Sequence, residues 1–384
     1  MRFEFATATR IIFGQGAIKE LASSAKLFGK RALIVVGRFG QRVAGLNAQL
    51  REAGIALSEF HVSVEPTVAV IEAGLEQARA EGCDLVISIG GGSVIDSGKA
   101  IAGLMTNPGR IYDYLEVVGL GKPLTNPSAP FIAIPTTAGT GSEVTRNAVL
   151  TVVDQRVKVS LRSSLILPRL AIVDPELTYG LPSEITAAAG LDALTQLIEP
   201  FLSNASNPLT DAICREGMRC VSRSLQIAFQ HGNDPRARED MALASLFGGI
   251  ALANAKLGAV HGFAGPIGGM FPVPHGAICA RLLPVVLETN LKALRDRADQ
   301  GSGLERFTEM SRLLTDDRDS RAEDGIRWLH DLCATLKVSP LATYGMTESD
   351  FTEIISQAKK ASSMKGNPIE LMDRELFRIM ELAL

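Results

Sequence analysis

The chain is poor in cysteine and in aromatic residues, and it carries almost no net charge. Its 384 residues include five cysteines, one tryptophan and four tyrosines, and the formal net charge is −3. The cysteines are scattered without Cys-x-x-Cys spacing, which argues against a disulfide framework and predicts reduced thiols in a cytoplasmic protein. The small net charge gives no electrostatic reason to expect nucleic acid or an anionic membrane as a partner.

Long apolar segments are also lacking. No run approaches the ~18 uninterrupted apolar residues of a transmembrane helix. The N-terminal segment 1–6 contains a glutamate and lacks an apolar core, so we expect neither a membrane span nor export. The length predicts two domains, and a hydrophobic content of 46% is typical of a soluble enzyme.

Short apolar runs alternate with helical patterns in the first half of the chain. Strands are expected at 31–36, 57–62, 85–89 and 169–174, with a short extended pair inside 2–15. Helices are expected at 17–28, from after Gly40 to about Ala53, and at 68–81, with irregular chain over 107–130. Strands that alternate with helices of this length predict a parallel sheet covered on both faces. In such sheets, ligands bind beyond the carboxyl ends of the strands.

Three consecutive glycines, 90–92, follow the strand at 85–89 and precede a helical pattern. Gly91 and Gly92 let the backbone approach a ligand, and free N–H groups at a helix start attract an anion, so this turn is a candidate pyrophosphate site. Ser93, with Asp96 three residues later, is expected to cap the helix. The motif matches neither G-x-G-x-x-G nor the P-loop, and an ordinary tight turn is the alternative.

A second cluster of glycine and hydroxyl residues follows the apolar run at 131–135. Hydrogen-bond donors are supplied there by Thr136, Thr137, Thr140 and Ser142. Two such clusters, each after a strand, suggest the two walls of one cleft that binds an anion. Lys158 could place a cation in that cleft, although an exposed strand lysine is the commoner case.

The end of the strand at 31–36 bears on the choice of dinucleotide. Gly37 and Arg38 stand there, with Arg42 about one helical turn on, and an acidic residue is lacking. An acid at this point selects the ribose of NAD, whereas an arginine accommodates the 2′-phosphate of NADP. We therefore favour NADP(H) over NAD(H); the alternative makes both arginines ordinary solvated residues.

Helical periodicity dominates after Leu181-Pro182, so we expect an α/β domain over 1–181 and an all-helical domain over 182–384. Helices are expected near 184–202, 208–230, 237–254, 304–315, 322–336 and 348–361. This half contains Asp192, His261 and His275. One carboxylate and two imidazoles can hold Fe²⁺ or Zn²⁺ with a coordination position left open. Judged by spacing alone, two structural histidines remain the alternative.

In combination, these motifs resemble the iron-containing (group III) alcohol dehydrogenase family, whose superfamily includes 3-dehydroquinate synthases. The resemblance spans nearly the whole chain. It rests on Gly90–Asp96, Pro135–Glu143, Gly190–Asp192, 258–276, Lys158, Asp174–Thr178 and Met364–Pro368. It implies a Rossmann-like N-terminal domain and an all-α C-terminal domain, with the metal and the nicotinamide between them.

The resemblance also implies roles for individual residues. Gly91, Gly92 and Ser93 would contact the pyrophosphate and Asp96 would lie near the nicotinamide. The nucleotide would be lined by Thr136, Thr137 and Thr140, and the metal would be held by Asp192, His261 and His275. The implied reaction is reversible hydride transfer between NAD(P) and a small or medium primary alcohol or aldehyde, in a homo-oligomer such as a dimer.

Two residues depart from the family pattern. Gln196 stands where the iron enzymes usually have a histidine, four residues after the aspartate, and Gly265 replaces a histidine four residues after His261. Gln196 could supply a weaker carbonyl ligand, so Zn²⁺ is at least as plausible as Fe²⁺, and the proton relay is undefined. The alternatives are a metal-independent reductase, a non-redox lyase, and a nucleotide-binding protein with a degraded metal site.

Overall fold

The computed structural model describes residues 2–37, 44–63, 65–297 and 302–384. The chain divides into two compact units. The sheet unit contains Ala6–Thr137 and Gly141–Tyr179, and the helical unit contains Met1–Phe5, Ala138–Thr140 and Gly180–Leu384. The chain passes from the sheet unit into the helical unit between Tyr179 and Gly180, close to the expected hinge at Leu181-Pro182. Met1–Phe5 and Ala138–Thr140 were expected in the first domain but belong to the helical unit.

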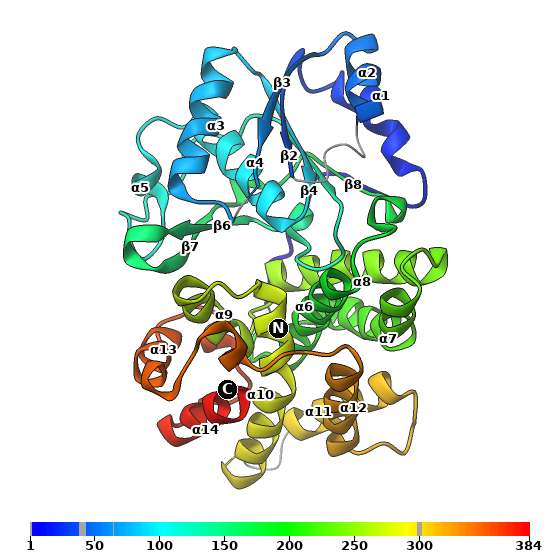
Figure 1. Cartoon of the computed structure of the whole chain (residues 1–384), viewed down its shortest axis with the longest axis vertical. Coiled ribbons are helices and arrows are strands. Elements are labelled where there is room, and N and C mark those ends of the chain that lie inside the picture. The colour runs from blue at the N-terminus through cyan, green and yellow to red at the C-terminus, as the bar shows by residue number, and fades with distance from the viewer. Residues whose placement is uncertain (1, 38–43, 64, 298–301) are drawn as a thin grey trace. The chain divides into compact units, whose positions relative to one another are not determined.

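A six-stranded parallel sheet forms the centre of the sheet unit (Figure 1), with the strand order β1-β8-β5-β4-β2-β3. The strands are β1 (Ile11–Phe13), β2 (Arg31–Val36), β3 (Ala56–His61), β4 (Leu85–Gly90), β5 (Phe131–Pro135) and β8 (Leu170–Val173). Every residue of β4 and β5 is buried, as expected of a parallel sheet covered on both faces. The α/β class predicted for this half is confirmed.

Helices cover both faces of this sheet, and side-chain alternation assigns each face. Leu33 and Val35 pack into the core beneath the helices on one face, whereas Ile34 and Val36 pack into the opposite core. The helices of this unit are α1 (Leu21–Ala25), α2 (Ala44–Glu52), α3 (Val68–Ala80), α4 (Gly92–Thr106) and the single turn α5 (Ile111–Tyr114). Figure 1 shows α3 and α4 on one side of the sheet and α1 and α2 on the other.

Close packing of α4 on the sheet depends on Gly98. A Cβ at this position would collide with Ser88 Oγ of β4 and would lie 3.0 Å from the ring of Phe131 in β5. We expect Gly98→Ala to lower the free energy of unfolding by about 1–3 kcal/mol, the usual cost of overpacking a core. Chemical denaturation measures this change.

Gly45 in α2 offers a matched control, because a Cβ there would meet no atom within 4 Å. Gly45→Ala should raise stability by up to ~1 kcal/mol through helix propensity alone. Equal effects of the two substitutions would contradict the packing argument.

Several local predictions for this half are wrong in detail. The segment 2–15 contains one strand, β1, paired with β8 rather than with a neighbour in sequence. The helix expected over 17–28 is a 3₁₀ turn, Ala17–Glu20, followed by the short α1. Ser93 does not cap α4: the N-cap is Gly91, and α4 begins at Gly92. An antiparallel hairpin, β6 (Asn147–Val152) and β7 (Val157–Arg162), packs beside α4.

The helical unit is built around one large apolar core. Its helices are α6 (Ser183–Leu202), α7 (Pro208–Gln230), α8 (Pro235–Asn254), α9 (Ala259–Met270), α10 (His275–Arg297), α11 (Ser302–Thr315), α12 (Ala322–Thr335), α13 (Phe351–Ala358) and α14 (Asp373–Ala383). Its strand-free architecture confirms the all-α prediction within the described residues. Of these helices, none by itself has the length and apolarity to cross a membrane; only α8 and α9 together, bent by 98°, resemble a broken span.

Three helices of this unit were not predicted, namely α9, α10 and α14. The α9 segment contains four glycines and Pro266, and α10 contains Pro284, so their local propensity is poor. Tertiary contacts satisfy the first N–H groups of α9: Ala259 N donates to Asn367 Oδ1 and Val260 N donates to Glu199 Oε1.

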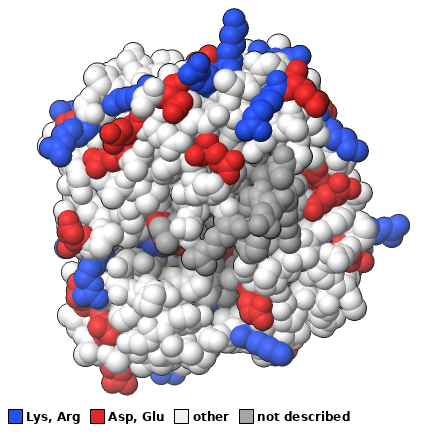
Figure 2. Space-filling view, turned by 45° about the horizontal axis from the view of Figure 1, so that its top comes forward, with Lys and Arg blue, Asp and Glu red and all other residues white. Residues whose placement is uncertain are grey.

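On the molecular surface, acidic and basic side chains are interspersed over the face that Figure 2 shows.

Candidate active site

The predicted nucleotide-binding residues of the sheet unit lie at the ends of three adjacent strands. Gly37 follows β2, Gly91 and Gly92 follow β4, and Thr136 and Thr137 follow β5, in the neighbour order β5-β4-β2. Thr136 N donates to Gly90 O at 3.0 Å, and a Cβ at Gly91 would lie 3.4 Å from Thr137 Oγ1. The two clusters therefore meet at one edge of the sheet.

This edge is also the topological switch point of the sheet. From β2 the chain moves outward to β3 and then returns to β4 on the other side of β2. Ligands of open α/β sheets bind at such a point. Gly37 and Gly90 leave room for Val94 in the first turn of α4, since a Cβ would lie 3.1 Å and 2.6 Å, respectively, from Val94 side-chain atoms. The start of α4 is thereby held at the switch point.

Other predicted cofactor residues have different surroundings. Asp96 accepts hydrogen bonds from Ser142 Oγ and, at 3.0 Å, from Val149 N. Lys158 on β7 forms a 3.2 Å ion pair with Glu65, and Thr140 belongs to the helical unit. Arg38, like Arg42, lies outside the described residues. The cofactor roles of these residues stay predictions.

The Asp96 carboxylate belongs to a buried polar network. Lys99 is fully buried; its Nζ donates to Ser142 O, Thr145 Oγ1 and Asn147 O at 2.7–2.9 Å and lies 3.8 Å from Asp96. Burial lowers the pKa of Lys99 to about 8, although Asp96 and Glu143 act to raise it. Glu143 is also buried, and its Oε2 has no hydrogen-bond partner in the described part of the chain.

Glu143 should make stability depend on pH. Burial raises its pKa from 4.5 to about 7, so the folded state holds a proton that the unfolded state has lost. The Glu143 contribution to stability therefore falls as pH rises from about 4.5 to about 7. We expect Glu143→Gln to match the wild type near pH 4.5 and to exceed it by on the order of 1–2 kcal/mol above pH 7. Denaturation midpoints at both pH values measure this; a constant difference between the two proteins would contradict it.

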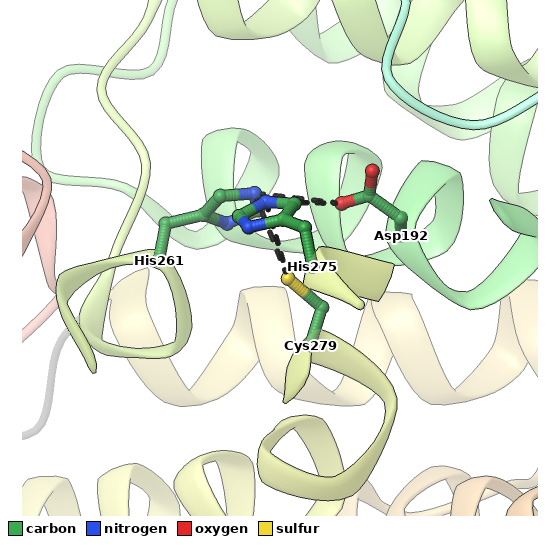
Figure 3. A group of neighbouring side chains, drawn as sticks. All are labelled: Asp192, His261, His275 and Cys279. Carbon is green, nitrogen blue, oxygen red and sulfur yellow. Dashed lines mark hydrogen bonds and ion pairs between the residues drawn. The ribbon is translucent and has the colours of Figure 1, made fainter. Parts of the chain in front are cut away.

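In the helical unit, the three predicted metal ligands come together with a fourth donor (Figure 3). Asp192 lies on α6, His261 on α9, and His275 opens α10. Asp192 Oδ1 is 3.6 Å from His261 Nε2 and 3.7 Å from His275 Nε2. Cys279 Sγ is 3.9 Å and 3.6 Å from the same two nitrogens, and the four donor atoms lie within 4.8 Å of one another.

These distances suit ligands of one cation better than hydrogen bonds. Asp192 Oδ1 is buried and has no hydrogen-bond partner among the residues that the structure describes. Tetrahedral ligands with bonds of ~2.1 Å are about 3.4 Å apart, close to the carboxylate–imidazole spacings here. A buried carboxylate oxygen that faces two imidazole nitrogens without a hydrogen bond fits a divalent metal ion.

Electrostatics in this pocket also favour a cation. Burial raises the pKa of Asp192, but His275, His261 and a hydrogen bond from Gln196 lower it by more, so the carboxylate is ionised. Burial lowers the pKa of His261, but Cys279, Glu199 and Asp192 raise it well above its usual value. The Glu199 and Asp192 carboxylates thus favour a proton on the His261 imidazole, and a metal ion would take the place of that proton.

Glu199, which the sequence analysis did not identify, holds His261 in place. It is buried near the end of α6; its Oε2 accepts from His261 Nδ1 at 2.6 Å and its Oε1 accepts from Val260 N at 2.7 Å. An ionised carboxylate only accepts hydrogen bonds, so the proton sits on Nδ1 and the lone pair of Nε2 is left for a metal. Gly258 is required beside it, because a Cβ there would lie 2.8 Å from Glu199 Oε1.

Glu199→Gln is expected to weaken metal binding by about 10- to 100-fold, the usual cost of losing an outer-shell partner. The amide can still accept from Val260 N, but its NH₂ then faces Nδ1 and moves the imidazole proton to Nε2. Chelator competition measures the affinity. Glu184→Gln, at an exposed position in the first turn of α6, is the control and should bind metal as the wild type does.

The two departures from the family pattern also have defined surroundings. Gln196 follows Asp192 by four residues on α6 and acts to lower the pKa of that carboxyl, and its Oε1 lies against α8, where a Cβ at Gly248 would be 3.5 Å away. Gly265 lies one turn after His261 on α9, and a Cβ there would meet no atom within 4 Å. Position 265 therefore has room for a larger side chain.

A parallel sheet with glycine-rich strand ends at its switch point, and a helical unit with one carboxylate and two imidazoles, define a metal-assisted, nucleotide-linked oxidoreductase. Comparison with known proteins gives the family. The iron-containing alcohol dehydrogenase model matches residues 8–175, and the model of the C-terminal part of that family matches residues 186–384. The chain belongs to the iron-containing alcohol dehydrogenase family, and it is an NAD(P)-dependent alcohol dehydrogenase.

Individual relatives match this chain over nearly its whole length. Alcohol dehydrogenase 4 of Schizosaccharomyces pombe is 36% identical over 384 residues, which cover 97% of this chain and 87% of the relative. The crystal structure of a 1,3-propanediol oxidoreductase superposes with a TM-score of 0.92 at 34% identity, with 100% of both chains covered. Sulfoacetaldehyde reductase from Bifidobacterium kashiwanohense, solved with NAD⁺, has a TM-score of 0.88 at 29% identity, covering 100% of this chain and 99% of that one. The predicted family and fold class are confirmed.

Proposed function

We propose that this enzyme interconverts small primary alcohols and aldehydes by hydride transfer to and from NADP(H), assisted by Fe²⁺ or Zn²⁺. The observation that carries the proposal is the buried Asp192 Oδ1, which has no hydrogen-bond partner among the described residues and lies 3.6 Å and 3.7 Å from two imidazole nitrogens. Asp192, His261 and His275 would hold the ion. When bound, the ion supplies Lewis acidity toward the substrate oxygen.

The residues of the chain supply binding and orientation. Glu199 fixes the His261 ring through the hydrogen bond at Nδ1, so this donor is preorganised. Gly91, Gly92, Ser93, Thr136 and Thr137 would bind the dinucleotide phosphates through backbone N–H groups and hydroxyls. When bound, the nicotinamide would supply the hydride chemistry, and these residues would hold and orient it.

The choice of NADP over NAD rests on Gly37 and Arg38 at the end of β2. The sulfoacetaldehyde reductase relative was solved with NAD⁺, so NAD(H) is the competing cofactor. The relatives named for 1,3-propanediol and sulfoacetaldehyde support a short substrate with a terminal oxygen function. We further propose a homo-oligomer, with a dimer as the simplest case, in the cytoplasm, where the five free cysteines would stay reduced.

The test follows nicotinamide absorbance with NADPH and NADH across short aldehydes and with both oxidised cofactors across the matching alcohols. Chelation should abolish turnover, and added Zn²⁺ or Fe²⁺ should restore it. His275→Ala should lose metal-dependent turnover, whereas His330→Ala, at an exposed position on α12, should not. Turnover that survives chelation would identify a metal-independent reductase; nucleotide binding without redox turnover would favour a lyase or a binding protein.

A further inference from the structure

Cys279 is positioned as a metal ligand although the sequence pattern assigns it no such role. It follows His275 by four residues on α10, so both side chains project from one face of the helix. Its Sγ is 3.6 Å from His275 Nε2 and 3.9 Å from His261 Nε2, and the residue is fully buried (Figure 3).

An independent observation comes from the opposite side of the pocket. Asp192 Oδ1 projects from α6 toward the same two nitrogens and has no hydrogen-bond partner within the described ranges. A thiol alone beside two imidazoles would be an ordinary buried cysteine. A thiol and a carboxylate oxygen without a hydrogen bond, both beside the same two imidazole nitrogens, make a cluster of four donor atoms within 4.8 Å of one another.

Gln196 explains why a donor from α10 is needed. In the iron enzymes, a histidine at this position would supply the fourth ligand from α6. Here the side chain is a neutral amide, and its Oε1 lies against Gly248 of α8. The remaining donor atom of the cluster is the sulfur of Cys279, which lies on α10.

We propose that the thiolate of Cys279 is the fourth protein ligand of the metal centre and that it makes the site select Zn²⁺ over Fe²⁺. The proposal rests on the metal-dependent function proposed above. Binding releases the thiol proton to solvent and forms a metal–sulfur bond, with no change of oxidation state. Among divalent ions, zinc accepts mixed sulfur, nitrogen and oxygen ligands in a tetrahedral set and can expand to five ligands.

Co²⁺ is the probe, because a thiolate bound to Co²⁺ gives a near-ultraviolet charge-transfer band that imidazole and carboxylate do not give. The metal-stripped full-length protein, loaded with one equivalent of Co²⁺, should show this band. Cys279→Ala and Cys279→Ser should lose it while keeping the visible bands of bound Co²⁺. Cys214→Ala, at another fully buried thiol of the helical unit, should keep both.

Metal competition tests the selectivity. Under anaerobic loading with equal Zn²⁺ and Fe²⁺, the wild type should bind mainly Zn²⁺, and Cys279→Ala should lower the zinc affinity by at least about 10- to 100-fold. One bound Co²⁺ without the charge-transfer band, in the wild type itself, would overturn the role of Cys279 and leave the proposed function standing. Failure to bind any of the three metals would overturn both.

Discussion

Replacing Asp192 by alanine should reduce kcat/KM with an aldehyde and reduced nicotinamide by at least about 1000-fold. The carboxylate is the donor that faces both imidazoles, and its ionised state is maintained by them. Without it, two imidazoles remain close together with one anionic partner fewer, so the site loses affinity for a cation. Lewis-acid assistance contributes several kcal/mol to such reactions, and each ~1.4 kcal/mol is tenfold in rate.

Metal analysis and steady-state kinetics on the same preparation check this expectation. Asp331→Ala, at an exposed position on α12, is the control and should leave both metal content and kcat/KM unchanged. Binding of the dinucleotide should survive in Asp192→Ala, because the predicted phosphate contacts are in the sheet unit. Activity within tenfold of the wild type would refute the catalytic role of the metal.

The central strands β2, β4 and β5 could be predicted because each is a short, almost wholly buried run with a glycine or proline at its end. Leu85–Gly90 and Arg31–Val36 lie within a residue of their expected positions. The cap of α4 could not be predicted, because Ser93 and Asp96 fit a local rule while Asp96 bonds to Ser142 and Val149, far along the chain. The local sequence therefore predicts that a helix follows β4, whereas contacts with residues distant in sequence determine where α4 begins.

The spacing of residues in the sequence was not sufficient to predict the metal site. Asp192, His261 and His275 lie on three helices, and two of these, α9 and α10, have poor helix propensity. Family resemblance supplied the three ligands, but it could not supply the contribution of Glu199, whose partners Val260 and His261 are distant in sequence. The spacing of four residues between His275 and Cys279 was a readable signal once α10 was known to be a helix.

Lys99→Met is expected to lower the free energy of unfolding by about 3–5 kcal/mol, the usual cost of breaking a buried ion pair from one side. The ammonium group is fully buried, and at neutral pH it is charged, because its pKa remains near 8. The substitution leaves Asp96 without its cation and removes the donor of hydrogen bonds to Ser142 O, Ser142 Oγ, Thr145 Oγ1 and Asn147 O. Lys26→Met, at an exposed position, should change stability by no more than about 0.5 kcal/mol.

The double variant Asp96→Asn with Lys99→Met separates charge from packing. An asparagine carries no charge, so the double variant should be more stable than Lys99→Met alone. Recovery should be partial, because Asp96 accepts from both Ser142 Oγ and Val149 N, and an amide offers only one acceptor oxygen. Denaturation midpoints of the four proteins in the cycle give the coupling free energy. If Lys99→Met and the double variant are equally unstable, the cost of Lys99→Met lies in the lost hydrogen bonds and not in the uncompensated charge of Asp96.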